Sequence, residues 1–299
     1  MKSAKGVSSR KTTRNGMCEE CAKICTGGVK SMVSKSYSAK ALVLKKTKLK
    51  ETDLIVTLLS DEGQTIKAVA KGARKPTSPF SSRLEPGNVV DGLFAKGRGD
   101  LDIIQEARLA VSHEVLHEDI LLATAITPGL ELLARSGQPD IAVDRVFSLT
   151  VKYLDLIEGV TPPTALALSV AHLLKACAFL GYRPSFDMCV SCGNPIDVYD
   201  STRFRYLSVS EGGVACSHCE RELPGAVMVP ALQVAWMHFL LKSPFEAVCK
   251  QSPDVAVSLS ICTFLQSWIQ VHGGVKLRSL DFLLKSHLFD DSKVSGDTE

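Results

Sequence analysis

The sequence predicts an α+β fold, in which a small N-terminal β-barrel is followed by a mainly helical domain. Between residues 37 and 107 the chain shows short runs of alternating apolar and polar residues, separated by turn signals. After residue 111 apolar residues recur three and four positions apart nearly to the end of the chain. Two cysteine pairs within this helical part predict a metal site there.

The two ends of the chain show no apolar periodicity. Residues 1–36 carry eight Lys or Arg side chains and many Ser, Thr and Gly. We therefore expect a disordered basic extension over residues 1–32, because it buries too little apolar surface to offset chain entropy. Cys18, Cys21 and Cys25 in this extension lack a fourth ligand nearby, and we expect them to be loose thiols. A second disordered tail is expected over residues 289–299.

The barrel is expected over residues 33–111. Turn residues such as Asp61-Glu62-Gly63 and Pro86-Gly87-Asn88 separate its strands. Five short strands within about 70 residues are typical of a small closed barrel of the OB type. The predicted strands are Tyr37–Leu44, Asp53–Leu59, Thr65–Ala70, Val89–Phe94 and Leu101–Ala107.

The helical domain is expected over residues 112–288. Pro128 lies inside the first helical segment, so we expect a kink or a break there. Gly and Pro residues mark the other helix ends. The predicted helices are Glu114–Leu133, Ile141–Glu158, Thr164–Leu180, Pro230–Leu240, Val255–His272 and Ser279–Leu288.

A four-cysteine metal site is predicted over residues 189–219 as a ribbon or knuckle insertion. Cys189-Val-Ser-Cys192 and Cys216-Ser-His-Cys219 are separated by 23 residues. Four thiolates close a tetrahedral shell around one zinc ion and leave no position for water, so the ion is expected to be structural. His218 is expected to stay outside the shell. The alternative is a set of thiols that binds no metal.

Charge is unevenly distributed along the chain. Residues 1–83 hold 18 Lys or Arg and 6 Asp or Glu, an excess of 12 positive charges, whereas residues 84–299 hold 17 and 26, an excess of 9 negative charges. A positive segment attracts polyphosphate chains, so we expect nucleic acid to bind the barrel.

The expected nucleic-acid contacts are basic side chains on the first strand and in the loop after the third. Lys67 on the third strand belongs to the same group. Aromatic residues are sparse here, so phosphate contacts should dominate, with weak sequence preference. The alternative is a solvated surface whose lysines keep sheet edges from pairing. The predicted contacts are Lys40, Lys45, Lys46, Lys48, Lys50, Lys71, Arg74, Lys75 and Arg83.

Other function classes are disfavoured. The sequence has no glycine-rich phosphate loop ending in Lys and Ser or Thr, and its histidines show no spacing typical of a catalytic set, so we expect neither an ATP-driven motor nor an enzyme. No run of about 18 apolar residues is present, so no membrane span is expected. The cysteine pairs fit a reducing compartment, which favours the cytoplasm.

Several segments, taken in this order, resemble the bacterial RecO family of recombination mediators. Residues 37–46, 53–60, 63–76 and 84–86 resemble its N-terminal OB domain. Gly181-Tyr-Arg-Pro184, the two cysteine pairs and residues 277–283 resemble its zinc region and C-terminal segment. The resemblance covers about residues 33–288.

This resemblance implies a DNA repair and recombination protein that binds single- and double-stranded DNA, anneals complementary strands and needs no nucleotide cofactor. It also implies two protein partners, RecR and the acidic, aromatic-ended tail of single-strand-binding protein. The complex helps RecA, indirectly, to replace that protein on DNA at the nucleoid. The basic positions above match the family's DNA-binding face, and the four cysteines match its metal ligands.

One alternative of a different class stays open from the sequence. A zinc-ribbon protein with an OB barrel could act as an RNA-binding adaptor in transcription or translation. An RNA reader uses exposed aromatic side chains, or groups that sense the 2′-hydroxyl, and the barrel sequence has few aromatics.

Overall fold

The computed structural model describes residues 36–97, 99–136, 144–200 and 202–289. The expected N-terminal extension and its three cysteines lie outside these residues. So does the expected C-terminal tail, apart from Phe289. That side chain is 1% exposed and packs in the helical core.

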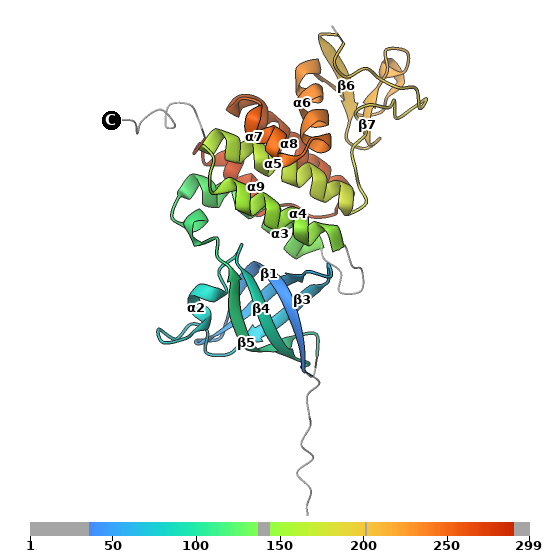
Figure 1. Cartoon of the computed structure of the whole chain (residues 1–299). Helices are drawn as coiled ribbons and strands as arrows, with labels where there is room; N and C mark the ends of the chain where they lie inside the picture. The colour runs from blue at the N-terminus through green and yellow to red at the C-terminus, as the bar shows by residue number, and fades with distance from the viewer. Residues whose placement is uncertain (1–35, 98, 137–143, 201, 290–299) are drawn as a thin grey trace, which may run out of the picture. The chain divides into compact units, whose positions relative to one another are not determined.

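Five strands form a closed barrel in the order β1-β2-β3-β5-β4 (Figure 1). Neighbouring strands are antiparallel except β3 and β5, which pair in parallel through residues 68–69 and 102–103. The predicted five-stranded barrel is therefore confirmed. The strands are β1 Ser36–Leu49, β2 Asp53–Ser60, β3 Thr65–Ala70, β4 Val89–Ala95 and β5 Asp102–Val111.

Because side chains alternate along the strands, some point into the barrel core and others pack in the core of the helical domain. Val43, Val56 and Leu58 point into the barrel and are fully buried. On the outer face Leu42 lies opposite Leu59, and both side chains pack in the core of the helical domain. The barrel residues that share this second core are Leu42, Leu44, Leu59 and Val89.

Helices make up most of the chain after the barrel. The long helix α5 contacts five other helices, namely α3, α4, α6, α7 and α8, so it forms the centre of this part (Figure 1). A short helix α2, Phe80–Arg83, lies between β3 and β4. The elements after β5 are η1 Glu114–His117, α3 Ile120–Ser136, α4 Asp144–Ile157, α5 Pro162–Phe179, α6 Ala231–Lys242, α7 Phe245–Lys250, α8 Val255–His272 and α9 Arg278–Lys285.

Two of these helices are long and apolar enough to cross a membrane by length and composition alone. They are α5, 67% of whose span is buried, and α8, 44% of whose span is buried. Core helices of soluble proteins meet the same test, so the test alone is weak evidence. The contacts of α5 on several sides are those of a core helix.

The sequence predicts a kink or a break at Pro128, and of these two the break is not present. Helix α3 runs through this residue from Ile120 to Ser136. Pro128 is buried, and the neighbouring carbonyl of Ala125 accepts hydrogen bonds from the Tyr153 and Ser169 hydroxyls of α4 and α5. Proline removes the N–H that would bond the carbonyl of Thr124, and the packing of this buried turn, together with the two hydroxyls at Ala125, keeps the helix continuous.

A three-stranded antiparallel sheet lies between α5 and α6 in sequence. Its order is β7-β6-β8, with β6 Phe204–Ser208, β7 Gly213–Ala215 and β8 Ala226–Pro230. A short turn, η2 Glu220–Glu222, precedes β8. The sequence predicts neither this sheet nor helix α7. The sheet carries the predicted metal site.

The turn before β4 joins the barrel to the helices. Asn88 accepts a hydrogen bond from the backbone N–H of His113 (2.8 Å), and the His113 ring lies 2.8 Å from the carbonyl of Gly87. The other ring nitrogen of His113 lies 2.9 Å from Asp155 of α4. The His117 ring contacts the carbonyl of Pro86 in the same turn. Four side-chain contacts therefore fix the segment between barrel and helices.

Candidate nucleic-acid interface and metal centre

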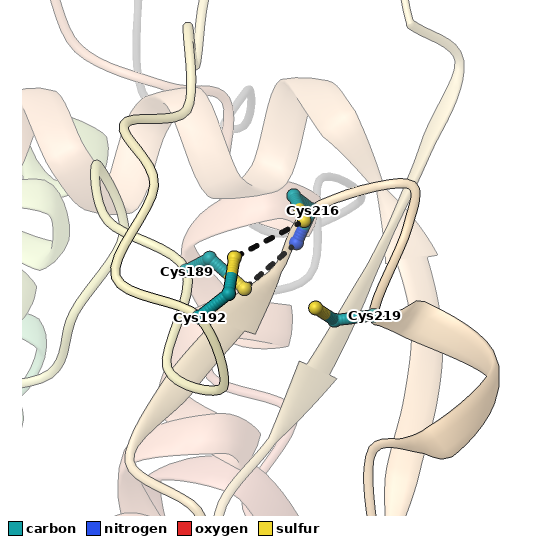
Figure 2. Close-up of side chains that lie close together, drawn as sticks. All are labelled: Cys189, Cys192, Cys216 and Cys219. Atoms are coloured by element: carbon teal, nitrogen blue, oxygen red, sulfur yellow. Dashed lines mark hydrogen bonds between the residues drawn. The ribbon is translucent and has the colours of Figure 1, made fainter.

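The four predicted metal ligands come together. The sulfur atoms of Cys189, Cys192, Cys216 and Cys219 all lie within 4.8 Å of one another, and Figure 2 shows the side chains converging from two loops. Cys192 Sγ lies 3.7 Å from Cys216 Sγ. Four sulfurs at about 2.3 Å from one zinc ion are about 3.8 Å apart, so the cluster has the size that such an ion requires.

Backbone amides lower the pKa of one thiol of this cluster, that of Cys189. Burial alone would raise the pKa of Cys189, but backbone N–H groups of Cys192, Cys216 and Ser191 donate to its sulfur and lower the pKa to about 6. The N–H of Cys216 lies 3.3 Å from Cys189 Sγ (Figure 2). Gly193, at φ 73°, turns the first loop back so that its N–H reaches the Cys189 carbonyl. The residues therefore fit a four-thiolate metal ion, and the exposed His218 is not part of the cluster.

The β1–β2 turn and the loop after β3 meet at one end of the barrel. The Arg74 guanidinium donates to the carbonyls of Lys50 and Glu51, and the N–H of Gly72 donates to Asp53. These contacts bring together five predicted cations, which we call the hairpin cluster. The hairpin cluster consists of Lys48, Lys50, Lys71, Arg74 and Lys75.

One carboxylate organises the hairpin cluster. The Gly72 N–H and the Thr52 hydroxyl donate to Asp53, and with the nearby charges of Lys50 and Lys71 they lower its pKa. Asp53 therefore stays ionised and holds the loop in place. Arg74 donates to main-chain carbonyls, and no ion pair is formed by any hairpin-cluster cation among the described residues.

A second group of cations lies on the outer face of the barrel. Lys45 of β1, Thr57 of β2 and Lys67 of β3 are cross-strand partners in one row. Because Val56 and Leu58 point inward, this row points outward. Both lysines are exposed, and half-buried Ile55 and Val69 lie opposite one another in the next outward row. We call Lys45, Thr57 and Lys67 the strand row.

The remaining predicted cations lie elsewhere. Lys40 pairs across the strands with Asp91, ten residues before the β1–β2 turn. Lys46 forms an ion pair with Glu85, and Arg83 of α2 donates to the carbonyl of Ala107. The structure thus groups five of the nine predicted positions in the hairpin cluster and one in the strand row.

A pocket of about 480 Å³ opens between α4, α5 and the segment that joins α6 to α7. The sequence did not predict it, because its walls come from segments that are distant in the chain. Its apolar lining includes Leu149, Phe179 and Phe245. We call this cavity the α5–α7 pocket. Its basic side chains are Lys152, Lys175, Arg183 and Lys242.

The cations of the α5–α7 pocket differ in their surroundings. Lys152 is paired with Glu246 at 2.7 Å, and Lys242 with Asp187 at 3.2 Å. Lys175 donates to two main-chain carbonyls and lies 5.7 Å from the centre of the Phe245 ring. Burial lowers the pKa of Lys175 to about 8. The pocket therefore combines apolar walls with cations suited to an acidic ligand.

Comparison with known proteins agrees with this architecture. A family model described as Recombination protein O N terminal matches residues 32–113, and Recombination protein O C terminal matches residues 117–281. The chain is 34% identical to "DNA repair protein RecO" of Frankia casuarinae and 36% identical to that of Nocardioides sp., in each case over 83% of this chain and 98% of the relative.

A more distant relative, "DNA repair protein RecO" of Caldanaerobacter subterraneus subsp. tengcongensis, is 25% identical over 82% of this chain and 96% of its own length. The two family models meet where the barrel ends and the helices begin. Together with the closed barrel and the helical part, these matches show that the chain belongs to the RecO family.

Proposed function

We propose that this protein is a DNA repair and recombination mediator. It binds single- and double-stranded DNA through its barrel, anneals complementary strands and, with RecR, helps load RecA onto DNA coated by single-strand-binding protein. The names of the relatives support the repair role. The observation that carries the DNA-binding step is the hairpin cluster, where two loops place cations together.

The chemistry of the hairpin cluster suits the sugar–phosphate backbone. Lysine and arginine side chains neutralise phosphates on either a single strand or a duplex and read no base. In the barrel Phe94 is buried and Tyr37 stacks on it at 5.4 Å, so neither ring is free to stack on a base. This argues for binding without sequence preference, and against the RNA-reading alternative, which needs exposed rings.

The α5–α7 pocket is the site we propose for the tail of single-strand-binding protein. That tail is acidic and ends in an aromatic residue. Apolar walls formed by Leu149, Phe179 and Phe245 suit an aromatic ring, and Lys175 and the exposed Arg183 suit its carboxylates. The tail would thereby bring the barrel to coated DNA.

The four-cysteine cluster is proposed to hold one structural zinc ion. Cys189, Cys192, Cys216 and Cys219 would supply the whole shell, which leaves no position for a reacting water. We propose accordingly that the protein is not an enzyme and that it works in the cytoplasm, where thiols stay reduced.

An annealing assay without ATP tests the function. Complementary strands coated with single-strand-binding protein should anneal faster when the protein is added. The double variant Lys71→Glu/Lys75→Glu should lose most of this activity, because it reverses two charges of the hairpin cluster but keeps Arg74, which also holds the loop.

The matched control is Arg203→Glu/Lys250→Glu, which makes the same charge change at two exposed cations outside the barrel. It should anneal at close to the normal rate. Equal activity of the two double variants would refute the placement of DNA on the hairpin cluster.

A further inference from the structure

A second cavity, of about 470 Å³, lies between the barrel and helices α3 and α9. Leu44, Ile126 and Leu130 lie beneath it and are each at most 3% exposed, so the apolar surface within reach of a ligand is that of half-buried Pro86 and the exposed ring of His117. Its rim is polar and includes Lys45, a member of the strand row, and Arg278 at the start of α9. We call this cavity the junction groove.

On the rim of the junction groove the carboxylates have partners, whereas two of the cations form no ion pair among the described residues. Its two carboxylates already have partners: Glu85 pairs with Lys46, while Glu131 accepts hydrogen bonds from the N–H groups of Arg278 and Ser279 and from the Ser279 hydroxyl. The side chains of Lys45 and Arg278 are exposed and form no ion pair among the described residues. The groove therefore presents two available cations together with Pro86 and the ring of His117.

This combination matches one segment of an unstacked single strand. The flat face of a nucleobase can stack on an aromatic ring such as that of histidine, while the phosphates on either side of it meet cations. A volume near the lower end of the range for small-molecule pockets, about 300–1,000 Å³, suits one nucleotide but no duplex. Lys45 also makes the groove continuous with the strand row on the outer face of the barrel.

We propose that the junction groove holds one unpaired nucleotide of single-stranded DNA, with its base against Pro86 and the ring of His117 and its phosphates on Lys45 and Arg278. The proposal rests on the proposed DNA-binding function and extends it to the helical domain. It gives the protein a contact that a duplex cannot make, and hence a preference for the unpaired strand.

Two variants test the groove. Thr127→Trp fills it from the exposed lip of α3, and Arg278→Ala removes the phosphate contact. The matched controls are Thr263→Trp, an exposed helical threonine whose hydroxyl also donates to the carbonyl four residues earlier, and Arg108→Ala on the barrel. Binding is measured with a labelled single strand and with a blunt duplex of the same length.

Thr127→Trp should lower affinity for the single strand about tenfold, the effect of losing one base contact, and Arg278→Ala should lower it by the loss of one phosphate contact; each should change duplex affinity less than about twofold. A single strand carrying 5-iodouracil should photocrosslink to the wild-type protein within residues 117–131 or 278–280. Unchanged single-strand affinity in both groove variants, or an equal loss on duplex, would overturn the proposal.

Failure of the junction groove proposal can be distinguished from failure of the proposed DNA-binding function. Lys71→Glu/Lys75→Glu should weaken binding of both the single strand and the duplex. If it does so while the groove variants bind normally, the junction groove proposal falls and the DNA-binding function stands. If it binds both normally, the hairpin cluster is not the DNA site, whatever the groove variants show.

Discussion

At the scale of single residues, Lys175 is a cation held away from water. Burial favours its neutral form, which lowers its pKa to about 8 from an ordinary value of 10.5. Below pH 8 its ammonium group is charged and attracts an acidic ligand in the α5–α7 pocket. Above pH 8 it loses that charge.

Binding of an acidic, aromatic-ended peptide to the α5–α7 pocket should therefore weaken between pH 7 and pH 9. Lys175→Met should weaken binding at pH 7 and remove most of this pH dependence, because it removes the buried ammonium group whose charge changes over that range. Titration of a labelled peptide at several pH values measures both effects. An unchanged pH profile in the variant would show that Lys175 does not face the peptide.

At Gly129 the neighbouring His172 ring leaves no room for a side chain. A Cβ atom there would lie 2.5 Å from His172 Nδ1, and that ring is fully buried and stacked on Tyr153 at 4.4 Å. Burial lowers the pKa of His172 to about 3, so the ring is neutral, and no hydrogen bond to its Nδ1 is present within the described part of the chain.

Gly129→Ala should reduce the free energy of unfolding by about 1–2 kcal/mol, since overpacking costs about 1–3 kcal/mol and better helix propensity returns at most about 1 kcal/mol. Urea unfolding measures it. Gly159→Ala, where a Cβ would meet nothing within 4 Å, is the control and should be nearly neutral. Stabilisation of the protein by Gly129→Ala would contradict the packing described here.

At the scale of elements, the four-cysteine cluster lies beside a sheet whose strands are too short to be stable alone. Strands β6, β7 and β8 have five, three and five residues, and the second cysteine pair lies between β7 and β8. A bound ion would therefore contribute most of the free energy that holds this sheet together.

Cys192→Ser should abolish binding of one zinc ion per chain and lower the melting temperature by at least about 5 °C, the shift that a loss of about 2 kcal/mol produces in a domain of this size. Metal analysis and thermal unfolding are the measurements. Cys249→Ser, at a half-buried thiol outside the cluster, should keep the ion. Full zinc content in the Cys192 variant would show that the site lies elsewhere.

Most elements could be predicted from sequence, because their patterns are local. Strand β3 and helix α8 begin and end at the predicted residues. The three short strands could not be predicted, since their pairing depends on the cysteine cluster more than on alternation. Of the kink or break expected at Pro128, the break does not occur, because tertiary contacts from Tyr153 and Ser169 support the helix there.

At the scale of the whole molecule, DNA binding should depend steeply on salt. If six phosphate contacts form, the logarithm of the binding constant should fall with the logarithm of salt concentration with a slope of about −4 on single strands. Lys71→Glu/Lys75→Glu removes two contacts and should bring the slope to about −3. Fluorescence anisotropy at several salt concentrations measures it, and an unchanged slope would mean that neither lysine meets a phosphate.

The convergence of the four cysteines could be predicted residue by residue, whereas the grouping of the lysines and arginines could be predicted only as a basic region. Cysteine spacing determines which thiols converge. Which lysines lie together depends on the contact of the β1–β2 turn with the loop after β3, made through Arg74 and Asp53, and no local pattern encodes it. The α5–α7 pocket and the junction groove depend in the same way on segments distant in sequence.

Part of the outer surface of the barrel is buried in the helical core, so a truncated barrel would expose apolar side chains. A fragment of residues 32–113 expressed alone would have an apolar patch exposed to water, formed by Leu42, Leu44, Leu59 and Val89. Such a fragment is expected to aggregate during purification. Serine or threonine at Leu42 and Leu59 should help to keep it in solution, at the cost of its ability to reassociate with the missing half.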